Sequence, residues 1–329
     1  MKLGIVGAGL IVHTLLEFIH EVDVELVAIA ATPNEKDKLL DLKQKHGFKY
    51  IYTDFEQMLN NNEIDTVYLG VNNHLHYTFA LKALNANKHI ILEKPFTSNY
   101  NQALKLVELA KRKKLMIFEA ISTIHNPNYL KIKELLPTIG DIKIVSLNYT
   151  QYSSRYDAFK KGEILPAFDY TKSGGALMDL NTYNIHFAVG LFGLPNKVDY
   201  IANISNNIDT SGILTMDYQS FKAVSIAAKD CGAPFVNCIQ GDLGCIYTSS
   251  PLFTLTHFEY QLNKEKPIHY DLTNNMHRMK HEFIDFLNIY NNKDYEACNQ
   301  IMEHALDVMK VLTDARAKVN LVFPDDKNL

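Results

Sequence analysis

The segment Glu93-Lys94-Pro95 carries side chains well suited to chemistry on an alcohol. It follows the apolar run HIIL, which predicts a buried strand. In an open α/β sheet, ligands bind at the carboxyl ends of the strands, where this segment falls. Lys94 can there donate a hydrogen bond to a substrate hydroxyl and stabilise its alkoxide, with Glu93 within reach of a cofactor. An exposed Glu-Lys pair is also common in solvated loops, so the segment alone leaves that alternative open.

Asp179 and Tyr183 form a second pair. They lie four residues apart in the segment GGALMDLNTY, so an α-helix entered through Gly174-Gly175 presents both on one face. A phenol at this place can pass a proton, and a carboxylate can keep a nearby lysine charged. His186 lies one turn further along the same face and is a candidate substrate-binding residue. The alternative is a buried polar helix whose side chains are satisfied by hydrogen bonds.

A third segment, Gly7-Ala8-Gly9, lies between the strand pattern KLGIV and a helix that begins near Leu10. Glycine permits a tight turn and lets the backbone approach a pyrophosphate at the helix N-terminus, whose N–H groups and dipole favour an anion. Val12 stands where a third glycine or alanine is usual, which predicts a slightly displaced helix. The strand-turn-helix context favours dinucleotide binding over a plain structural turn.

The second predicted strand ends at Ala31-Thr32, where an NAD-selective site usually has an acid for the ribose hydroxyls. No acid occurs before Glu35, and its absence permits a 2′-phosphate, which Thr32 and Lys36 can assist. No arginine is present to clamp that phosphate. A solvated loop that accepts either cofactor is therefore the alternative.

The elements that must position these residues begin with alternating β-branched runs and amphipathic helical patterns, as in βαβ units. Buried strands are predicted at residues 2–6, 24–30, 66–71, 89–92 and 115–120. Helices are predicted at residues 15–22, 35–47, 77–88 and 101–114, with Gly47 as a C-cap. Right-handed crossovers would wind these elements into a doubly wound sheet.

The pattern changes after about residue 121. Further elements are a helix at 128–136, a strand at 142–152, a buried helix at 174–193, successive strands over 197–271, and helices from about 276 and 299. The predicted fold class is α/β, with an N-terminal Rossmann doubly wound parallel sheet at residues 1–121. A C-terminal α+β domain with a large, mainly antiparallel open sheet follows at residues 122–329.

Composition excludes several classes of protein. The 329 residues include 33 Lys plus Arg and 37 Asp plus Glu, for a net charge of −4, and 47% are hydrophobic. These values argue against a nucleic-acid binder and a disordered chain. No segment approaches the roughly 20 apolar residues that span a bilayer, so we expect no membrane partner.

The cysteines at 231, 238, 245 and 298 are too few and too far apart for a disulfide scaffold or a zinc site. We expect buried, inert thiols in a reduced, cytoplasmic protein. No cluster of His, Asp or Glu has convincing ligand spacing, so we expect no metal.

Together these segments resemble the Gfo/Idh/MocA oxidoreductase family over essentially the whole chain. GIVGAGLI is similar to the family's N-terminal fingerprint, VNNHLHYTFALKAL to its sheet-edge segment, HIILEKPF to its lysine motif and SGGALMDLNTY to its glycine-led motif. The last residue of that motif is commonly His. Here it is Tyr183, as in the branch that resembles glucose-fructose oxidoreductase and dimeric dihydrodiol dehydrogenases.

The resemblance implies roles for individual residues. Lys94 matches the catalytic lysine, Tyr183 the proton donor or acceptor, and Asp179 the aspartate that orients this pair and the substrate. Positions that match the cofactor site are Gly7, Gly9, Leu10 and Ile11 at the pyrophosphate, Ala31 and Thr32 at the ribose, and Asn72, Asn73, His76, Glu93 and Lys94 at the nicotinamide.

The chain also departs from the family pattern. NADP-using relatives often have Ser-Arg at Ala31-Thr32, which bears on cofactor preference, and many members carry an arginine before an aromatic residue at Thr123-Ile124, which bears on the substrate.

The sequence therefore predicts an NAD(P)-dependent oxidoreductase, with a mild preference for NADP, acting on a secondary alcohol or carbonyl of a sugar, polyol or cyclic diol. The alternative is a catalytically silent, dinucleotide-binding regulatory protein, because fold alone does not establish activity. The resemblance further implies a homodimer formed through one broad sheet face of the second domain and a cis bond between Lys94 and Pro95.

Overall fold

The computed structural model describes residues 1–327, which divide into two compact units. The first comprises residues 1–120 and 282–306, and the second comprises residues 121–281 and those from 307 onward. The first break lies within one residue of the boundary predicted at 121. Residues 282–306, placed in the second domain by the sequence pattern, belong to the first unit by their contacts.

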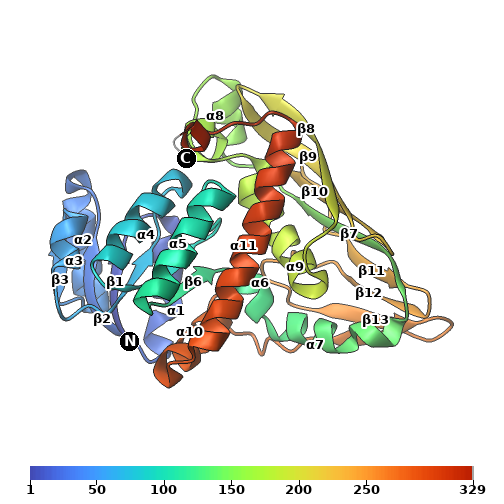
Figure 1. Cartoon of the computed structure of the whole chain (residues 1–329), viewed down its shortest axis with the longest axis horizontal. Helices are drawn as coiled ribbons and strands as arrows, with labels where there is room; N and C mark the ends of the chain where they lie inside the picture. Colours follow the sequence, from blue (N-terminus) through green and yellow to red (C-terminus); the bar gives the residue numbers. More distant parts are fainter. Residues whose placement is uncertain (328–329) are drawn as a thin grey trace. The chain divides into compact units, whose positions relative to one another are not determined.

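The first unit contains a six-stranded, all-parallel sheet in the order β3-β2-β1-β4-β5-β6, the strand order of a Rossmann fold. Helices cover its faces; Figure 1 shows α4 and α5 lying over the strands. Its strands are β1 (Lys2–Val6), β2 (Glu25–Ala30), β3 (Tyr50–Tyr52), β4 (Thr66–Leu69), β5 (His89–Glu93) and β6 (Ile117–Ala120). Its helices and turns are α1 (Leu10–Phe18), η1 (Ile19–Glu21), η2 (Pro33–Glu35), α2 (Lys36–His46), α3 (Phe55–Leu59), η3 (Asn73–Leu75), α4 (His76–Asn85) and α5 (Tyr100–Lys113).

The strands of this unit are apolar runs because a parallel sheet is covered on both faces, so side chains on both sides of each strand are buried. Gly47 is the predicted C-cap of α2, with φ +77°. The sequence pattern missed β3, whose three residues are only partly buried or exposed, whereas α1 begins at Leu10, as the glycine loop predicted.

Two aromatic residues near the end of the chain complete the first unit. Phe283 and Phe286 belong to α10 (Lys280–Asn292). The Phe283 ring lies 5.5 Å from that of Phe18, and the Phe286 ring stacks at 4.8 Å on that of Phe118. Helix α11 (Tyr295–Lys318) then contributes residues to both units.

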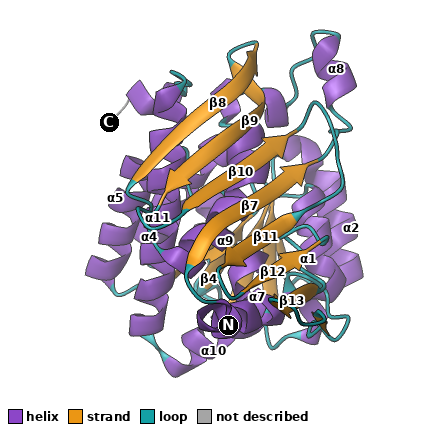
Figure 2. Ribbon diagram, turned by 90° about the vertical axis from the view of Figure 1, so that its right-hand side faces the viewer, coloured by secondary structure: helices purple, strands orange, loops and turns teal. Residues whose placement is uncertain are grey.

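The second unit contains an eight-stranded sheet in the order β14-β13-β12-β11-β7-β10-β9-β8 (Figure 2). Only β7 and β10 pair in parallel, and every other neighbouring pair is antiparallel. The strands are β7 (Ile142–Thr150), β8 (Lys197–Ser205), β9 (Ile208–Asp217), β10 (Lys222–Ala228), β11 (Asn237–Gly241), β12 (Gly244–Thr248), β13 (Phe258–Leu262) and β14 (Ile268–Tyr270). Its helices and turns are α6 (Ser122–His125), α7 (Pro127–Leu135), η4 (Leu136–Ile139), α8 (Tyr156–Lys160), η5 (Pro166–Phe168), η6 (Tyr170–Lys172), η7 (Leu177–Asn181), α9 (Thr182–Phe192) and η8 (Pro324–Lys327).

Helix α9 lies behind this sheet in Figure 2, whereas none of the helices described here covers β8, β9, β10 and β7 on the face turned to the viewer. Asn184 donates to the Ile226 carbonyl at 3.2 Å, and Ser225 donates to Asn181, so the helical segment is fixed to β10. On the opposite face, Ile201 and Ile213 are 72% and 43% exposed.

The cysteines correct one expectation. Cys298 is buried, but Cys231 is exposed and Cys238 and Cys245 are partly exposed. On β11 and β12 the neighbouring isoleucines occupy the buried face, and alternation turns both cysteines to the other face. Desolvation nevertheless raises the pKa of all four thiols, which agrees with inert side chains.

Within residues 1–327, no helix combines the length and apolar character that crossing a membrane requires. Across the same described part of the chain, no group of three or more His, Cys, Asp or Glu side chains is arranged to hold a metal ion.

Candidate active site

The glycine loop after β1 fits a dinucleotide. Gly7 has φ +114°, and a Cβ there would lie 2.4 Å from the Gly70 carbonyl oxygen, so no other residue fits without backbone movement. Gly9 is the N-cap of α1, and a Cβ there would meet no atom within 4 Å. The first turn of α1, with Leu10 and Ile11, has neither a capping side chain nor an acidic residue. The open space before this helix N-terminus therefore suits an anion.

Val12 occupies the position of the usual third small residue and is fully buried. The small residue stands opposite instead, because a Cβ on Gly70 would lie 3.0 Å from a Val12 methyl group. At this contact the large side chain, Val12, therefore lies on the helix, and the small residue, Gly70, lies directly after the neighbouring strand.

The loop after β2 brings an acid to the predicted ribose site. Thr32 donates a hydrogen bond to Glu35 Oε2 at 3.0 Å, and Lys38 contacts the other Glu35 oxygen at 3.4 Å. Ala31 precedes this turn, and Lys36 begins α2. Because η2 folds the chain back, Glu35 is closer to Thr32 than its place in the sequence suggested.

The predicted nicotinamide residues lie in the loops after β4 and β5. Asn73 begins η3, and Asn72, which is exposed, is the N-cap before it. Glu93 is buried and accepts a hydrogen bond from Tyr68 at 2.5 Å. Lys94 is partly exposed, and the predicted cis bond to Pro95 is confirmed.

His76 is fully buried beneath these loops. Its Nδ1 lies 2.8 Å from the Pro95 carbonyl oxygen, and its Nε2 lies 3.0 Å from the Val71 carbonyl oxygen. Burial lowers the pKa of His76 to about 4, although both carbonyl contacts raise it. The neutral ring has one N–H, so it donates a hydrogen bond to one of these two carbonyl oxygens and only packs against the other. It lies between the loop after β4 and the loop that carries Lys94.

In the second unit, the glycine-led segment starts a π-helical turn rather than the expected continuous α-helix. This turn, η7, carries Asp179, and α9 carries Tyr183 and His186. The expectation that Asp179 and Tyr183 share a face assumed α-helical spacing, whereas a π turn inserts an extra residue, and such turns are frequent at functional sites. His186 is fully buried.

A buried aspartate holds the start of this segment. Asp209 Oδ2 accepts hydrogen bonds from the Leu177 N–H at 2.7 Å and from the Tyr200 hydroxyl at 2.8 Å. Gly175 has φ +102°, and a Cβ there would lie 2.0 Å from Asp209 Oδ1. Desolvation raises the pKa of Asp209 to about 6, against the lowering effect of its two hydrogen bonds.

One partner of Asp179 is a lysine that the sequence motifs did not include. Lys229 Nζ donates to Asp179 Oδ2 at 2.7 Å. A signal for it exists, because Ala223, Ser225 and Ala227 are buried alternately along β10 and Lys229 continues that period of two.

Tyr183 packs in an aromatic cluster made by Tyr149, Phe235 and Phe253. Its ring lies 5.8 Å from that of Tyr149 and 5.7 Å from that of Phe253, which itself stacks on Tyr149 at 5.2 Å. Tyr183 is 9% exposed, while Phe235 and Phe253 are partly buried. The Arg278 guanidinium lies 5.7 Å from the Phe253 ring centre. The cluster gives the Tyr183 side chain apolar neighbours.

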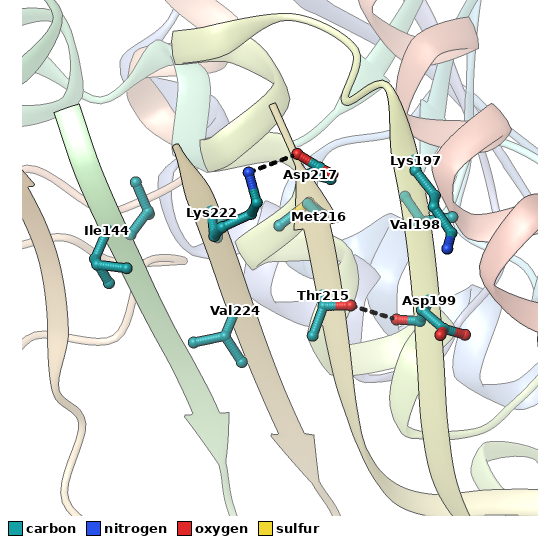
Figure 3. Close-up of a pocket in the computed structure, with 11 residues that line it drawn as sticks. Ile144, Lys197, Val198, Asp199, Thr215, Met216, Asp217, Lys222 and Val224 are labelled. Atoms are coloured by element: carbon teal, nitrogen blue, oxygen red, sulfur yellow. Dashed lines mark hydrogen bonds and ion pairs between the residues drawn. The ribbon is translucent and has the colours of Figure 1, made fainter. Parts of the chain in front are cut away.

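A depression of about 380 Å³ lies elsewhere, on strands β7 to β10 (Figure 3). Lys222 and Asp217 form an ion pair at 2.9 Å within it, beside Ile144 and Val224. It contains none of the predicted catalytic or cofactor residues.

Comparisons with known proteins decide the family. A model described as "Oxidoreductase family, NAD-binding Rossmann fold" (GFO_IDH_MocA) matches residues 1–121. A trans-1,2-dihydrobenzene-1,2-diol dehydrogenase of Xenopus tropicalis is 30% identical over 78% of this chain and 77% of its own length. The chain belongs to the Gfo/Idh/MocA oxidoreductase family. The predicted NAD(P)-dependent oxidoreductase class is thereby confirmed.

Two further matches cover nearly the whole chain. The scyllo-inositol 2-dehydrogenase (NADP(+)) of Bacillus subtilis is 29% identical over 99% of both chains. A 3-ketoreductase of Actinomadura kijaniata, solved with NADP and TDP-benzene, is 17% identical and matches with a TM-score of 0.84 over 97% of both chains. At this identity the match supports the fold alone, and it agrees with the predicted Rossmann sheet followed by a mainly antiparallel one.

Proposed function

We propose that this oxidoreductase interconverts a secondary alcohol and its ketone on a ring that bears neighbouring hydroxyls, within the class of sugars, polyols and cyclic diols. The observation that carries the proposal is that the lysine motif at Lys94 and the glycine-led motif at Asp179 and Tyr183 are both intact. Relatives named for scyllo-inositol and for a dihydrobenzene diol support it, because both names describe hydroxyls on six-membered rings.

The proposed chemistry assigns one role to each residue. In the oxidative direction, Tyr183 accepts the hydroxyl proton while the positive charge of Lys94 stabilises the developing alkoxide. Asp179 orients this pair and the substrate. The bound nicotinamide supplies the two-electron acceptor or donor. The glycine loop with Leu10 and Ile11 holds the pyrophosphate, and the loops with Asn72, Asn73 and Glu93 line the nicotinamide.

We propose that His76 acts by positioning those loops, because both of its ring nitrogens contact backbone carbonyls. His186, fully buried on α9, is kept as the alternative proton carrier.

The aromatic cluster supports a cyclic substrate. Tyr149, Phe235 and Phe253 give the Tyr183 side chain an apolar side on which the C–H face of a ring can pack. Open-chain polyols offer no such face. We therefore expect scyllo-inositol and trans-cyclohexane-1,2-diol to be oxidised faster than sorbitol.

A mild preference for NADP is proposed for the cofactor. The absence of an acid at Ala31-Thr32 supports it, as does the NADP-dependent relative. Glu35 opposes a preference for NADP, because its carboxylate accepts a hydrogen bond from the Thr32 hydroxyl and at that place would repel a 2′-phosphate. The preference is therefore expected to be small.

A homodimer through the open sheet face is also proposed. Ile201 and Ile213 face each other across β8 and β9, and Ile213 faces Ile226 on β10, so the three form an apolar row. Such a row on an uncovered face supports self-association. Light scattering that shows a monomer at micromolar concentration would remove this proposal. The four unpaired thiols support a reducing, cytoplasmic location.

The test of function begins with fluorescence titration of NADPH and NADH, followed by a screen of the three alcohols with NADP⁺ and NAD⁺ by nicotinamide absorbance. We expect binding of both cofactors and turnover of the cyclic alcohols. Binding without turnover of any sugar, polyol or diol would instead favour a regulatory protein, and a preference for sorbitol would contradict the proposed ring specificity.

A further inference from the structure

We infer that Lys229 is a positioning residue that sets the orientation of Asp179, and this inference rests on the function proposed above. Lys229 follows directly after the last residue of β10 and lies outside all the motifs that resemble the family. Asp179 lies 50 residues earlier in the chain.

The ammonium group of Lys229 is almost completely enclosed. The residue is 2% exposed. Its Nζ donates to Asp179 Oδ2 at 2.7 Å and to the carbonyl oxygen of Ala167 at 2.7 Å. The ring centre of Phe168 lies 4.8 Å from the same nitrogen. Two hydrogen bonds and one aromatic face match the three N–H groups of an ammonium ion.

Burial makes this arrangement specific. A buried ammonium is strongly disfavoured unless a carboxylate opposes it, so Lys229 requires Asp179. The Asp179 side chain is 33% exposed, and the contact with the buried Lys229 ammonium is made by its Oδ2. Lys229 therefore keeps Oδ2 turned inward.

A second carboxylate belongs to the same charge group. The charge of Lys229 acts on Asp209, which binds the Leu177 N–H at the start of η7. Lys229 is thus the counter-charge for two acids: Asp179, which lies within η7, and Asp209, which binds the first residue of η7. Removing the ammonium leaves two neighbouring acids without it.

Lys229 also fixes the chain that precedes the glycine-led turn. The Ala167 carbonyl accepts the Gly175 N–H at 3.2 Å in addition to Lys229, and the Ser153 N–H donates to the Lys229 carbonyl at 2.9 Å. One residue therefore connects the segment between residues 153 and 167 to the turn from which Asp179 follows.

The first experiment compares Lys229→Met, which removes the charge, with Lys229→Arg, which keeps it. For Lys229→Met we expect kcat to fall about 10–100-fold, the size expected when a reacting group is displaced by about 1 Å. The affinity for NADPH, which the first unit binds, should stay within about twofold of the parent. Lys229→Arg should recover most of kcat.

The matched control is Lys143→Met in the same unit. Lys143 forms an exposed ion pair with Asp141 at 3.3 Å, so losing it should leave kcat unchanged. A second measurement combines Lys229→Met with Asp179→Asn. If Lys229 acts through Asp179, the double variant should be no slower than Asp179→Asn alone.

Four results would overturn the inference. Lys229→Met with parental kcat means that the contact does not matter for the reaction, and multiplying effects in the double variant mean that Lys229 acts independently of Asp179. A parallel loss of NADPH affinity and thermal stability that Lys229→Arg does not restore points to general unfolding. A parent protein that turns over none of the alcohols overturns the proposed function, and with it the role given to Lys229.

Discussion

The two units hold their candidate catalytic groups by different means. In the first, the loop that carries Lys94 packs against a neutral buried ring, because His76 lies between two backbone carbonyls and donates to one of them. In the second, the turn that carries Asp179 is fixed by buried charges, with Lys229 against the aspartate and Asp209 against the Leu177 N–H. One site is supported mainly by backbone and the other by ionic side chains.

The difference explains how readily each site can be recognised. A site held by backbone requires glycines and a proline at fixed short spacings, as at Gly7 and Lys94-Pro95, and these are visible in a linear sequence. A site held by charges depends on partners far apart, since Asp209 lies 32 residues after Leu177. Such partners are visible only once the sheet register is known.

Removing the reacting group of each unit should have the largest effect. Tyr183→Phe keeps the ring in its aromatic cluster but loses the hydroxyl, so turnover should fall about 10²–10⁴-fold while NADPH affinity persists. Lys94→Ala should be at least as damaging, because it removes both a charge and a hydrogen bond to the substrate oxygen. Asp179→Asn should be milder if the residue only orients the pair. Steady-state kinetics with the best cyclic alcohol measures all three.

His186→Ala serves as the discriminating variant for that prediction. Should turnover collapse in His186→Ala while Tyr183→Phe stays close to the parent, His186 is the proton carrier and the assignment of Tyr183 is wrong.

Two glycine substitutions compare the units directly. Gly175→Ala forces a Cβ into Asp209 at a positive φ, so the free energy of unfolding should fall by about 2–4 kcal/mol. Gly9→Ala meets open space and should change the free energy of unfolding by less than about 0.5 kcal/mol. It should still weaken NADPH binding, because its methyl group projects beside the proposed pyrophosphate site. Urea unfolding and fluorescence titration test the pair, and an unfolding cost equal at both glycines would contradict it.

The buried acid and the buried histidine should give stability opposite dependences on pH. The pKa of His76 is lowered from 6.5 to about 4, so the unfolded chain takes up the proton first and stability is lost as pH falls between those values. The pKa of Asp209 is raised from 3.8 to about 6, so the folded protein takes up the proton first and stability is gained over much of the same interval. Each of the two pKa shifts changes the free energy of unfolding by about 3 kcal/mol across its pH interval, at about 1.36 kcal/mol per pKa unit.

Single variants separate the two contributions. Asp209→Asn removes the acid's contribution, so its free energy of unfolding relative to the parent should rise by up to about 3 kcal/mol from pH 4 to pH 7. His76→Gln should change in the opposite direction over the same range. Urea unfolding of all three proteins at several pH values measures the differences, and equal slopes for parent and variants would show that neither group titrates as described.

The smallest expected effect lies at the ribose site, the part of the first unit that depends on side chains. Glu35→Gln removes a negative charge beside Thr32, so the ratio of NADPH to NADH affinity should rise about threefold to tenfold. Thr32→Asp should move the ratio toward NADH. Fluorescence titration gives both ratios, and an unchanged ratio in both variants would place the 2′-phosphate elsewhere.

Much of the first unit could be predicted because its signals are local. The glycine loop and the C-cap at Gly47 each depend on residues that are adjacent in the sequence. The cis Lys94-Pro95 bond was implied by the family resemblance of the lysine motif. Strand β3 escaped because three partly exposed residues give no periodic signal. The position of Glu35 escaped because it depends on the turn η2.

The second unit was less accessible to prediction. Its class followed from alternating strands, but the π turn at Asp179 breaks the α-helical spacing from which the shared face was inferred. Lys229 carried a period-two signal along β10, yet a lysine at the end of an apolar strand is ordinarily exposed. The cysteines at 238 and 245 were placed inside because the sequence does not state which face of a strand is covered.

The inclusion of residues 282–306 in the first unit has a consequence for synthesis of the protein. Phe283 and Phe286, the partners of Phe18 and Phe118, are added only about 160 residues after residue 120, where the first part of this unit ends, and this takes on the order of 10–30 s at typical elongation rates. During that interval the nascent Rossmann sheet carries an uncovered aromatic surface, a natural target for chaperones. A messenger truncated before codon 282 would therefore yield an aggregation-prone fragment rather than an independent nucleotide-binding module.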